Sequence, residues 1–241
     1  MPVFNEANTL KKSLEGLYRE LLLLNGVNFE VIVVESNSTD GSREILLELS
    51  KVFEFKLFLE LEPKGKGRAV RKGLDFASGN WIMIFDADME YLPSDIHKLI
   101  SISKNGYYDF IIGSRRDESF RVRNFGQHRV REFAMNVAHV FFSFLISLTV
   151  GKTLHDPFSM YKLFRKDLFE NVALQSDRFD LDWELVLIAG RLHANFTEVS
   201  VSYKSRNFSE GKKIRFFRDP FNWLGAWFKY SFFPIRRRHN L

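Results

Sequence analysis

Two aspartates, Asp86 and Asp88, stand on either side of one small residue, Ala87. They directly follow residues 81–85, an apolar run with the composition of a buried strand. Two carboxylates at a strand end can hold one divalent ion, and oxygen ligands are those that Mg²⁺ and Mn²⁺ prefer. Such an ion would neutralise charge on a leaving diphosphate. A pair of turn aspartates that cap the following segment is the alternative interpretation.

Two further segments have the composition of a ligand site. Residues 35–40 are polar and follow another apolar run, so we expect them at the same sheet edge as Asp86, where open α/β sheets bind ligands. The segment Lys64-Gly65-Lys66-Gly67 leads into a helical pattern and could bring N–H groups and positive charge to a phosphate. It lacks the spacing of a P-loop, and a flexible solvated loop is the alternative.

The elements that must position these residues alternate along the first two thirds of the chain, which is typical of βαβ units. The expected fold class is therefore α/β, Rossmann-like, with a mainly parallel central sheet. We expect strands at residues 29–34, 55–59, 81–85, 110–113 and 160–164, and helices at residues 8–24, 40–52, 67–77, 93–103, 124–148 and 182–192.

The amino-acid composition is that of a globular domain without disulfides. The chain of 241 residues is 45% hydrophobic and 27% charged, which is typical of a globular domain. It has no cysteine, which excludes disulfides and thiolate metal sites. We found no repeat or linker, so residues 1–207 are expected to form one domain, with residues 208–241 as a basic, aromatic segment.

The positive charge of the chain is a property of its carboxyl end. The net charge is +5, and residues 204–241 hold ten Lys and Arg against two Asp and Glu, so the remainder carries −3. Aromatic residues interleave with these basic ones, a pattern that suits a membrane surface at least as well as it suits nucleic acid. We predict a surface helix with Trp223, Leu224, Trp227 and Phe228 on one apolar stripe, and no nucleic-acid partner. The alternative is a helix that packs its aromatics on the core.

The remaining sequence gives no sign of a membrane span or of export. Residues 133–150 are apolar but include Asn136 and His139, so we expect a buried or amphipathic helix rather than a spanning one. No secretory signal is visible at the amino end. The expected location is cytoplasmic, with peripheral contact at the cytoplasmic face of a membrane.

Several motifs in a fixed order resemble the inverting glycosyltransferases of family 2, which have the GT-A fold, and especially their polyprenol-phosphate branch. The resemblance covers most of the chain. The motifs are Pro2-Val3-Phe4-Asn5-Glu6, residues 33–42, Lys66-Gly67-Arg68-Ala69, Asp86-Ala87-Asp88, Ile112-Gly113-Ser114-Arg115, residues 156–162, Glu198-Val199-Ser200-Val201, and Arg206 with Gly211-Lys212.

The resemblance implies transfer of a sugar from a UDP- or GDP-sugar donor to a polyprenyl phosphate, with inversion and with Mg²⁺ or Mn²⁺ as cofactor. It implies a donor site made of Pro2, Phe4, Glu6, Glu35, Ser36, Lys66, Gly67, Asp86, Ala87, Asp88, Arg115 and Lys212. The expected catalytic residues are Asp86, Asp88, Asp156, Arg131 and Arg206, and the expected metal ligands are Asp86 and Asp88. Arg115, Arg131, Arg206 and Lys212 are the candidate phosphate clamps.

Two departures from the family pattern leave alternatives open. Glu35 and Ser36 replace two aspartates, and the first strand is expected to be truncated because only Met1 precedes Pro2. A family 2 enzyme with a soluble hydroxyl acceptor, using Asp156 as base, is one alternative. A degenerate protein that binds a nucleotide or a membrane without turnover is the other.

Overall fold

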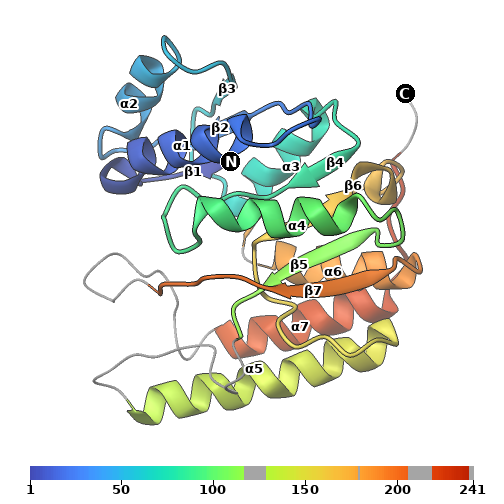
Figure 1. Cartoon of the computed structure of the whole chain (residues 1–241). Helices are drawn as coiled ribbons and strands as arrows, with labels where there is room; N and C mark the ends of the chain where they lie inside the picture. Colours follow the sequence, from blue (N-terminus) through green and yellow to red (C-terminus); the bar gives the residue numbers. More distant parts are fainter. Residues whose placement is uncertain (117–128, 179, 206–218, 239–241) are drawn as a thin grey trace.

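The computed structural model describes residues 1–116, 129–178, 180–205 and 219–238 (Figure 1). Its strands are β1 (Pro2–Val3), β2 (Ile32–Glu35), β3 (Lys56–Leu59), β4 (Trp81–Met83), β5 (Phe110–Ser114), β6 (Lys162–Arg165) and β7 (Phe196–Ser200). Its α-helices are α1 (Ala7–Leu22), α2 (Ser42–Leu49), α3 (Lys66–Phe76), α4 (Ile96–Ser103), α5 (Arg129–Val150), α6 (Leu181–Arg191) and α7 (Asp219–Phe232). Two 3₁₀ helices, η1 (Pro93–Asp95) and η2 (Lys166–Phe169), precede α4 and follow β6.

The strands form two sheets, one parallel and one mixed. The first sheet has the order β1-β2-β3 and is wholly parallel. The second has the order β4-β6-β5-β7, in which β5 and β7 are parallel while β6 runs antiparallel to both of its neighbours. The α/β fold class and the parallel first sheet are as the sequence predicts, whereas the direction of β6 was not foreseen.

The predicted elements are found, with two differences among the strands. The predicted strand at residues 29–34 begins only at Ile32, because its ladder with β3 begins at the pair Ile32 and Lys56. Strand β7 was not predicted as a strand, although Phe196 is buried and the next three side chains are half-buried, as expected beside β5. The predicted helix at residues 124–148 is α5, and residues 124–128 of it lie outside the described chain.

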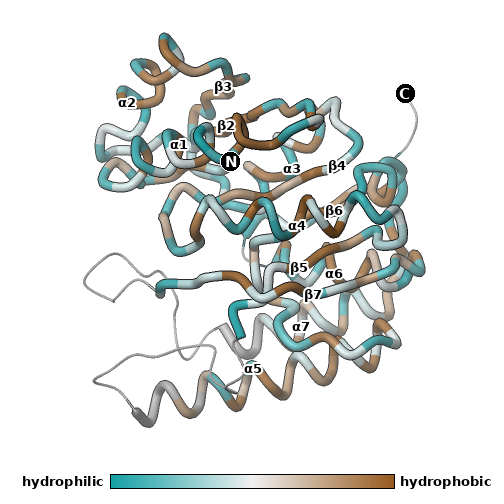
Figure 2. Tube along the Cα trace, in the orientation of Figure 1, coloured by the Kyte–Doolittle hydropathy of each residue, from teal (hydrophilic) through white to brown (hydrophobic). Residues whose placement is uncertain are grey.

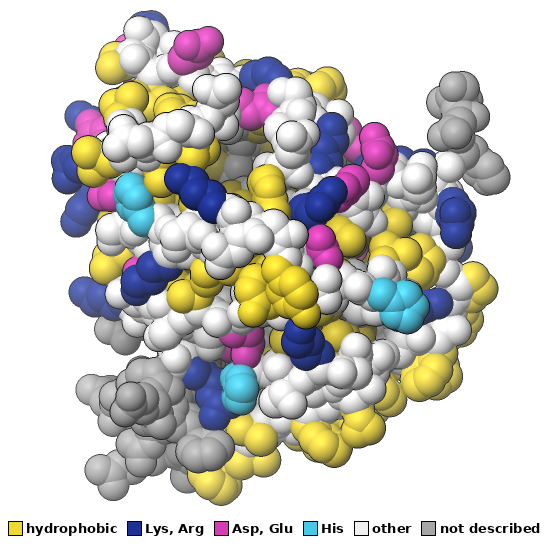
Figure 3. Space-filling model, turned by 45° about the vertical axis from the view of Figure 1, so that its right-hand side comes forward, with side chains coloured by type: hydrophobic (Ala, Val, Ile, Leu, Met, Phe, Trp, Pro, Cys, Tyr) yellow, Lys and Arg dark blue, Asp and Glu magenta, His cyan; other side chains and the backbone are white. Residues whose placement is uncertain are grey.

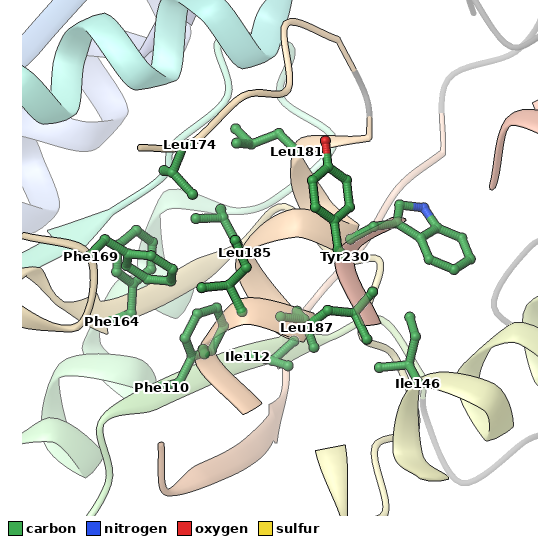
Figure 4. Packing of buried hydrophobic residues seen from close by; sticks show 14 of the residues in the cluster. Phe110, Ile112, Ile146, Phe164, Phe169, Leu174, Leu181, Leu185, Leu187 and Tyr230 are labelled. Atoms are coloured by element: carbon green, nitrogen blue, oxygen red, sulfur yellow. The ribbon is translucent and has the colours of Figure 1, made fainter. Parts of the chain in front are cut away.

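The larger core cluster lies between the second sheet and the helices α5, α6 and α7 (Figure 4). Phe110 and Ile112 of β5 meet Leu185 and Leu187 of α6 in this cluster, together with Ile146 of α5. Every residue of α6 from Leu181 to Gly190 is buried, because the helix lies between the sheet and the two outer helices. This arrangement fixes the position of every polar side chain that α6 carries.

The carboxyl-terminal helix α7 packs on the same core as the rest of the chain. Ala226 and Tyr230 are buried in the larger cluster, and Trp223 and Trp227 pack against it. The Trp227 Nε1 atom donates a hydrogen bond to Thr149 Oγ1 of α5 at 3.0 Å. The predicted stripe is therefore divided, since its two tryptophans face the core while Leu224 and Phe228 are exposed. Within the described chain, no helix is both long enough and apolar enough to span a membrane.

Candidate functional site

The pair of aspartates lies just beyond the end of β4. The Asp86 carboxylate accepts a hydrogen bond from Lys66 Nζ at 2.7 Å, and both side chains are largely buried. The Asp88 carboxylate accepts one from the Glu90 amide at 3.0 Å. Ala87 is buried in the smaller core cluster and anchors the segment between them. Met89 has a left-handed backbone, with φ at 59°, which is strained for a side chain of this kind and is common at functional loops.

Lys66 opens α3 and stands among carboxylates. Burial alone would lower the pKa of its ammonium group, but Asp86 and Asp182 outweigh this effect and raise the pKa above its ordinary value. The side chain is therefore positively charged at every physiological pH. The structure thus joins the basic loop and the aspartate pair, as the sequence suggests.

The glycines around Lys66 serve close packing of the backbone. A Cβ atom on Gly65 would lie 2.3 Å from the Asp177 carbonyl oxygen, and one on Gly67 would lie 2.5 Å from the Ser176 carbonyl oxygen. The Arg68 amide donates to the Asp177 carbonyl at 3.1 Å. The interpretation of this segment as a flexible solvated loop is wrong, because it packs against residues 176–178. This close packing is sufficient to explain Gly65 and Gly67, so the two glycines are not by themselves evidence of a phosphate site.

The loops that follow β1 and β2 are joined by side-chain to backbone hydrogen bonds. The backbone N–H of Asn5 donates to Ser38 Oγ at 3.0 Å, and the backbone N–H of Glu6 donates to Ser42 Oγ at 2.9 Å. In return, the Asn5 side chain accepts from the Thr39 amide at 2.8 Å. These bonds place Pro2, Phe4 and Glu6 beside the polar segment 35–40, with which the family resemblance groups them in the predicted donor site.

Glu35 and Ser36 are both buried, and their side chains are engaged within the protein. The Glu35 carboxylate accepts from the Ser38 amide at 2.6 Å and forms an ion pair with Arg43. Ser36 Oγ donates to Glu60 Oε2 at 2.8 Å. Glu35 and Ser36 thus form a buried polar network with Arg43 and Glu60, beneath the loop that follows β2. The role of Glu35 as acceptor for a donor base stays a prediction, and Glu60 is a member of the site region that the sequence analysis missed.

Asp156 and Arg115 form a buried, bidentate ion pair on the other side of the site. The Arg115 side chain donates to the two Asp156 carboxylate oxygens at 2.8 and 2.7 Å, and its amide donates to one of them at 2.8 Å. Burial raises the pKa of Asp156, but the charge and hydrogen bonds of Arg115 hold it well below the ordinary range. His139 of α5 lies 3.7 Å from the same carboxylate. The predicted clamp Arg115 is therefore held in place by the predicted base.

Three further charged residues around this pair were not among the predicted site residues. Lys162 is fully buried and pairs with Asp182 at 2.9 Å. Burial raises the pKa of Asp182 above its ordinary value, although Lys162 and Lys66 act against this. Glu198 accepts hydrogen bonds from the His155 and Asp156 amides, both at 2.7 Å. Asp182 is thus within electrostatic reach of both Lys66 and Arg115, which links the two sides of the site. The sequence signal that could have identified Asp182 is its place, with Glu184, in the first turn of a largely apolar helix.

The three remaining predicted site residues lie partly or wholly outside the described chain. Arg131 belongs to the first turn of α5, but its side chain is not described. Arg206 and Lys212 lie outside the described residues.

Comparison with known proteins decides the family. The model of glycosyl transferase family 2 matches residues 1–173, which is more than half of the chain. The chain belongs to glycosyl transferase family 2. Among the relatives of this family 2 protein is a dolichol-phosphate mannosyltransferase of Pyrococcus furiosus, 32% identical over 215 residues, which cover 88% of this chain and 57% of the relative.

A second relative is an undecaprenyl-phosphate 4-deoxy-4-formamido-L-arabinose transferase of Yersinia enterocolitica. It is 25% identical over 214 residues, which cover 88% of this chain and 61% of the relative. The family 2 chain thus spans about three fifths of the length of these two relatives.

Solved structures share the fold of this family 2 chain. One is a glucosyl-3-phosphoglycerate synthase from Mycobacterium tuberculosis in complex with Mn²⁺, UDP and glucosyl-3-phosphoglycerate. It matches with a TM-score of 0.67 at 19% identity, and the match covers 97% of this chain and 78% of the synthase chain. Another is a mannosyltransferase from Pyrobaculum calidifontis in complex with GDP-Man and Mn²⁺. It matches with a TM-score of 0.53 at 18% identity, and the match covers 83% of this chain and 53% of the mannosyltransferase chain. The likeness shows the GT-A fold that the motifs imply.

The carboxylates of Asp86 and Asp88 fit a hard divalent cation that takes its further ligands from a phosphate group. Among the described residues, no group of three or more His, Asp or Glu side chains could enclose a metal by itself. Mg²⁺ sites of phosphate enzymes typically use one or two carboxylates and take further ligands from substrate phosphates. Asp86 and Asp88 supply two carboxylates at one strand end, as that arrangement requires.

Proposed function

We propose that this family 2 chain is a metal-dependent hexosyltransferase that moves a sugar from a UDP- or GDP-sugar to a polyprenyl phosphate, with inversion at the anomeric carbon. The observation that carries the proposal is the pairing of Lys66 with Asp86 beside Asp88. It gathers a fixed positive charge and two carboxylates at one strand end, next to the loops that end β1 and β2.

On the donor side, the diphosphate of the nucleotide sugar binds Lys66, next to Asp86 and Asp88. A divalent ion held by the two aspartates, Mg²⁺ or Mn²⁺, would supply neutralisation of the departing diphosphate. Lys66 adds a permanently charged donor for a phosphate oxygen. The two similar solved structures, which hold Mn²⁺ with UDP and with GDP-Man, support both candidate bases equally. The base is therefore left as uracil or guanine.

On the acceptor side, the names of the two relatives support a polyprenyl phosphate. An acceptor phosphate oxygen is already ionised, so it forms the bond to the anomeric carbon without a strong base. The bond from that carbon to the donor diphosphate breaks on the opposite side, and the nucleoside diphosphate leaves. A hydroxyl acceptor would need a base, and Asp156 suits that role poorly because Arg115 holds its pKa below the ordinary range.

The positive side chains around this reaction have positioning roles. Asp156 holds the Arg115 guanidinium in one orientation, over the Tyr203 ring at 5.3 Å, so that it can face a phosphate at low entropic cost. Arg131, Arg206 and Lys212 are the remaining proposed phosphate clamps. We retain the expectation of peripheral contact at the cytoplasmic face of a membrane as part of the proposal, since the acceptor is a membrane lipid.

Binding of the product nucleotide tests the donor site. The wild-type chain should gain thermal stability from Mn²⁺ with UDP or GDP, by about 2.7 kcal/mol at 100 times the dissociation constant. Asp88→Ala should lose this gain at the same concentrations, because it removes a metal ligand. Asp167→Ala, at an exposed aspartate paired with Arg165, is the matched control and should respond as the wild type does. An Asp88→Ala protein that responds like the control would contradict the donor site.

A further inference from the structure

Tyr203 lies three residues beyond the end of β7 and was not among the predicted site residues. Strand β7 pairs with β5, and the segment that continues β7 changes from hydrophobic to hydrophilic along its length (Figure 2). The Tyr203 side chain is half-buried and packs against the smaller core cluster, which also contains Ala87 of the aspartate segment. Tyr203 therefore follows the sheet at the point where the chain leaves the core.

The backbone of residues 203 and 204 is bonded to the loop that carries Asp88. Tyr203 forms an isolated antiparallel bridge with Tyr91. The Lys204 backbone N–H donates to the Glu90 carbonyl at 2.8 Å. Because these contacts use backbone atoms, any residue at position 203 other than proline can make them. The contributions of the Tyr203 hydroxyl and ring are therefore additional to this pairing.

The Tyr203 hydroxyl holds the side chain of Glu90. It donates a hydrogen bond to Glu90 Oε2 at 2.8 Å. The Glu90 backbone N–H in turn donates to Asp88 Oδ1 at 3.0 Å, and Met89 between them has the left-handed φ of 59°. A methionine keeps such a conformation only where its surroundings impose it. The hydroxyl thus fixes one end of the strained loop whose backbone orients the Asp88 carboxylate.

The ring of Tyr203 supports Arg115. The guanidinium carbon of Arg115 lies 5.3 Å from the centroid of this ring, and a guanidinium over an aromatic face is attracted by the charge distribution of the ring. The ring of Tyr91 lies 5.2 Å from that of Tyr203 and is itself buried and stacked on Tyr161. Arg115 is thus held both by the Asp156 carboxylate and by a ring that rests on the core.

These contacts differ from the charge pairs on the surface. Figure 3 shows basic and acidic side chains spread over one face of the molecule, where water screens their interactions. The side chain of Arg115 is only 7% exposed, and that of Asp156 is fully buried. The interactions of Arg115 are therefore screened little, so its contact with the Tyr203 ring should have a larger effect than a similar contact in water.

We propose that Tyr203 is a positioning residue that links the two sides of the active site. Its hydroxyl acts through Glu90 to orient Asp88 on the donor side, and its ring orients Arg115 on the acceptor side. One side chain thereby aligns the metal-binding loop with a phosphate-binding arginine, and displacement requires such alignment of the reacting groups. The contacts hold for any reaction, whereas the roles of Asp88 and Arg115 rest on the proposed function.

Two substitutions separate the hydroxyl from the ring. Tyr203→Phe keeps the ring and removes the hydroxyl, whereas Tyr203→Leu removes both. The Phe variant should bind Mn²⁺ with UDP or GDP about tenfold more weakly, because contacts behind a metal ligand commonly have effects of this size. At saturating donor it should keep the wild-type KM for a short polyprenyl phosphate. The Leu variant should show the same loss of affinity and, in addition, an acceptor KM that is about fivefold higher.

A measurement on Arg115 itself tests the ring contact without the reaction. Phenylglyoxal modifies guanidinium groups that it can reach, and mass spectrometry of peptides follows modification at position 115. Arg115 should react about fivefold faster in Tyr203→Leu than in the wild type, and at the wild-type rate in Tyr203→Phe. The variants Tyr107→Phe and Tyr107→Leu, at a tyrosine that is 62% exposed, are the matched controls and should leave all three measurements unchanged.

The outcomes separate this role from a merely structural one and from the proposed function. An unchanged affinity for Mn²⁺ with nucleotide in Tyr203→Phe would overturn the inference, as would an unchanged modification rate in Tyr203→Leu. Equal changes of the acceptor KM in both variants would also overturn it and leave Tyr203 as a packing residue. A wild type that binds no nucleotide with Mn²⁺ would contradict the donor site and the hydroxyl's role together. A wild type that binds the nucleotide but transfers no sugar to the lipid phosphate would contradict only the proposed function, because the affinity and modification measurements would still decide the role of Tyr203.

Discussion

At the scale of single residues, the described site is a set of paired charges rather than a set of free ones. Asp86 pairs with Lys66, Asp156 with Arg115 and Asp182 with Lys162. Breaking a buried pair by removing one member leaves the other charge without compensation. Each pair therefore couples stability to function, and substitutions must be judged on both.

Replacing Asp156 by Asn should reveal this coupling. The variant leaves the Arg115 guanidinium buried beside a neutral amide, which should lower the free energy of unfolding at pH 7 by about 3–5 kcal/mol. Because the folded state holds the pKa of Asp156 well below its ordinary value of 3.8, its stabilisation is fully present above that value, begins to decline below about pH 4, and is lost as the pH falls through the lowered pKa. Chemical denaturation at pH 7 and pH 3 measures both effects.

The difference in stability between the two proteins should therefore be smaller at pH 3 than at pH 7. Glu62→Gln, at an exposed carboxylate paired with the exposed Lys64, provides the control and should change little at either pH. A difference between wild type and Asp156→Asn that stays constant from pH 7 to pH 3 would contradict the ion pair as the source of stability.

At the scale of elements, much of the framework follows from local patterns. The apolar runs that end before Glu35 and Asp86 predict strands with polar residues at their carboxyl ends, and both segments are found there. The direction of β6 could not be predicted, because an apolar segment such as Leu163-Phe164 fits a parallel or an antiparallel neighbour equally well. Its pairing with β4 and β5 depends on the whole path of the chain.

The site could be predicted less completely than the strands. The Asp86–Lys66 contact follows from two motifs that meet at one sheet edge. The Lys162–Asp182 pair joins β6 to α6 across 20 positions of sequence, and no periodicity in either element indicates it. The partition of the aromatic residues of α7 likewise depends on where α5 and α6 lie, so Trp227 and Phe228, although adjacent in sequence, have opposite surroundings.

The glycine at position 65 provides a test at this scale. Its φ is +104°, and a Cβ atom there would lie 2.3 Å from the Asp177 carbonyl oxygen. Gly65→Ala should therefore lower the free energy of unfolding by about 2–4 kcal/mol, since strain and collision add. Gly26→Ala separates strain from collision, because Gly26 also has a positive φ, +69°, but a Cβ atom added there would meet no atom within 4 Å. It should cost about 1 kcal/mol. Equal losses in thermal melts of the two variants would show that packing against residues 176–178 is unimportant.

At the scale of the whole molecule, the fold brings a candidate donor site and a candidate acceptor site close to the same buried charged residues. The first lies at the ends of β1, β2 and β4, and the second lies between β5 and the inner side of α5. Asp182 on the buried helix α6 is electrostatically coupled to both. The family match to residues 1–173 covers the candidate donor-site residues from Pro2 to Arg115 and reaches past Asp156, whereas Lys212 lies beyond it.

Formation of a sugar–phosphate lipid tests the central claim most directly. Purified chain would be incubated with radiolabelled UDP- and GDP-sugars, a short polyprenyl phosphate and Mn²⁺, and label would be counted in the organic phase. The account predicts label transfer with one of these donors, a loss of about 100-fold or more in Asp88→Ala, and loss on chelation of the metal. Transfer that is undiminished in Asp88→Ala and in chelator would contradict the account, as would transfer to soluble hydroxyl acceptors with none to the lipid phosphate.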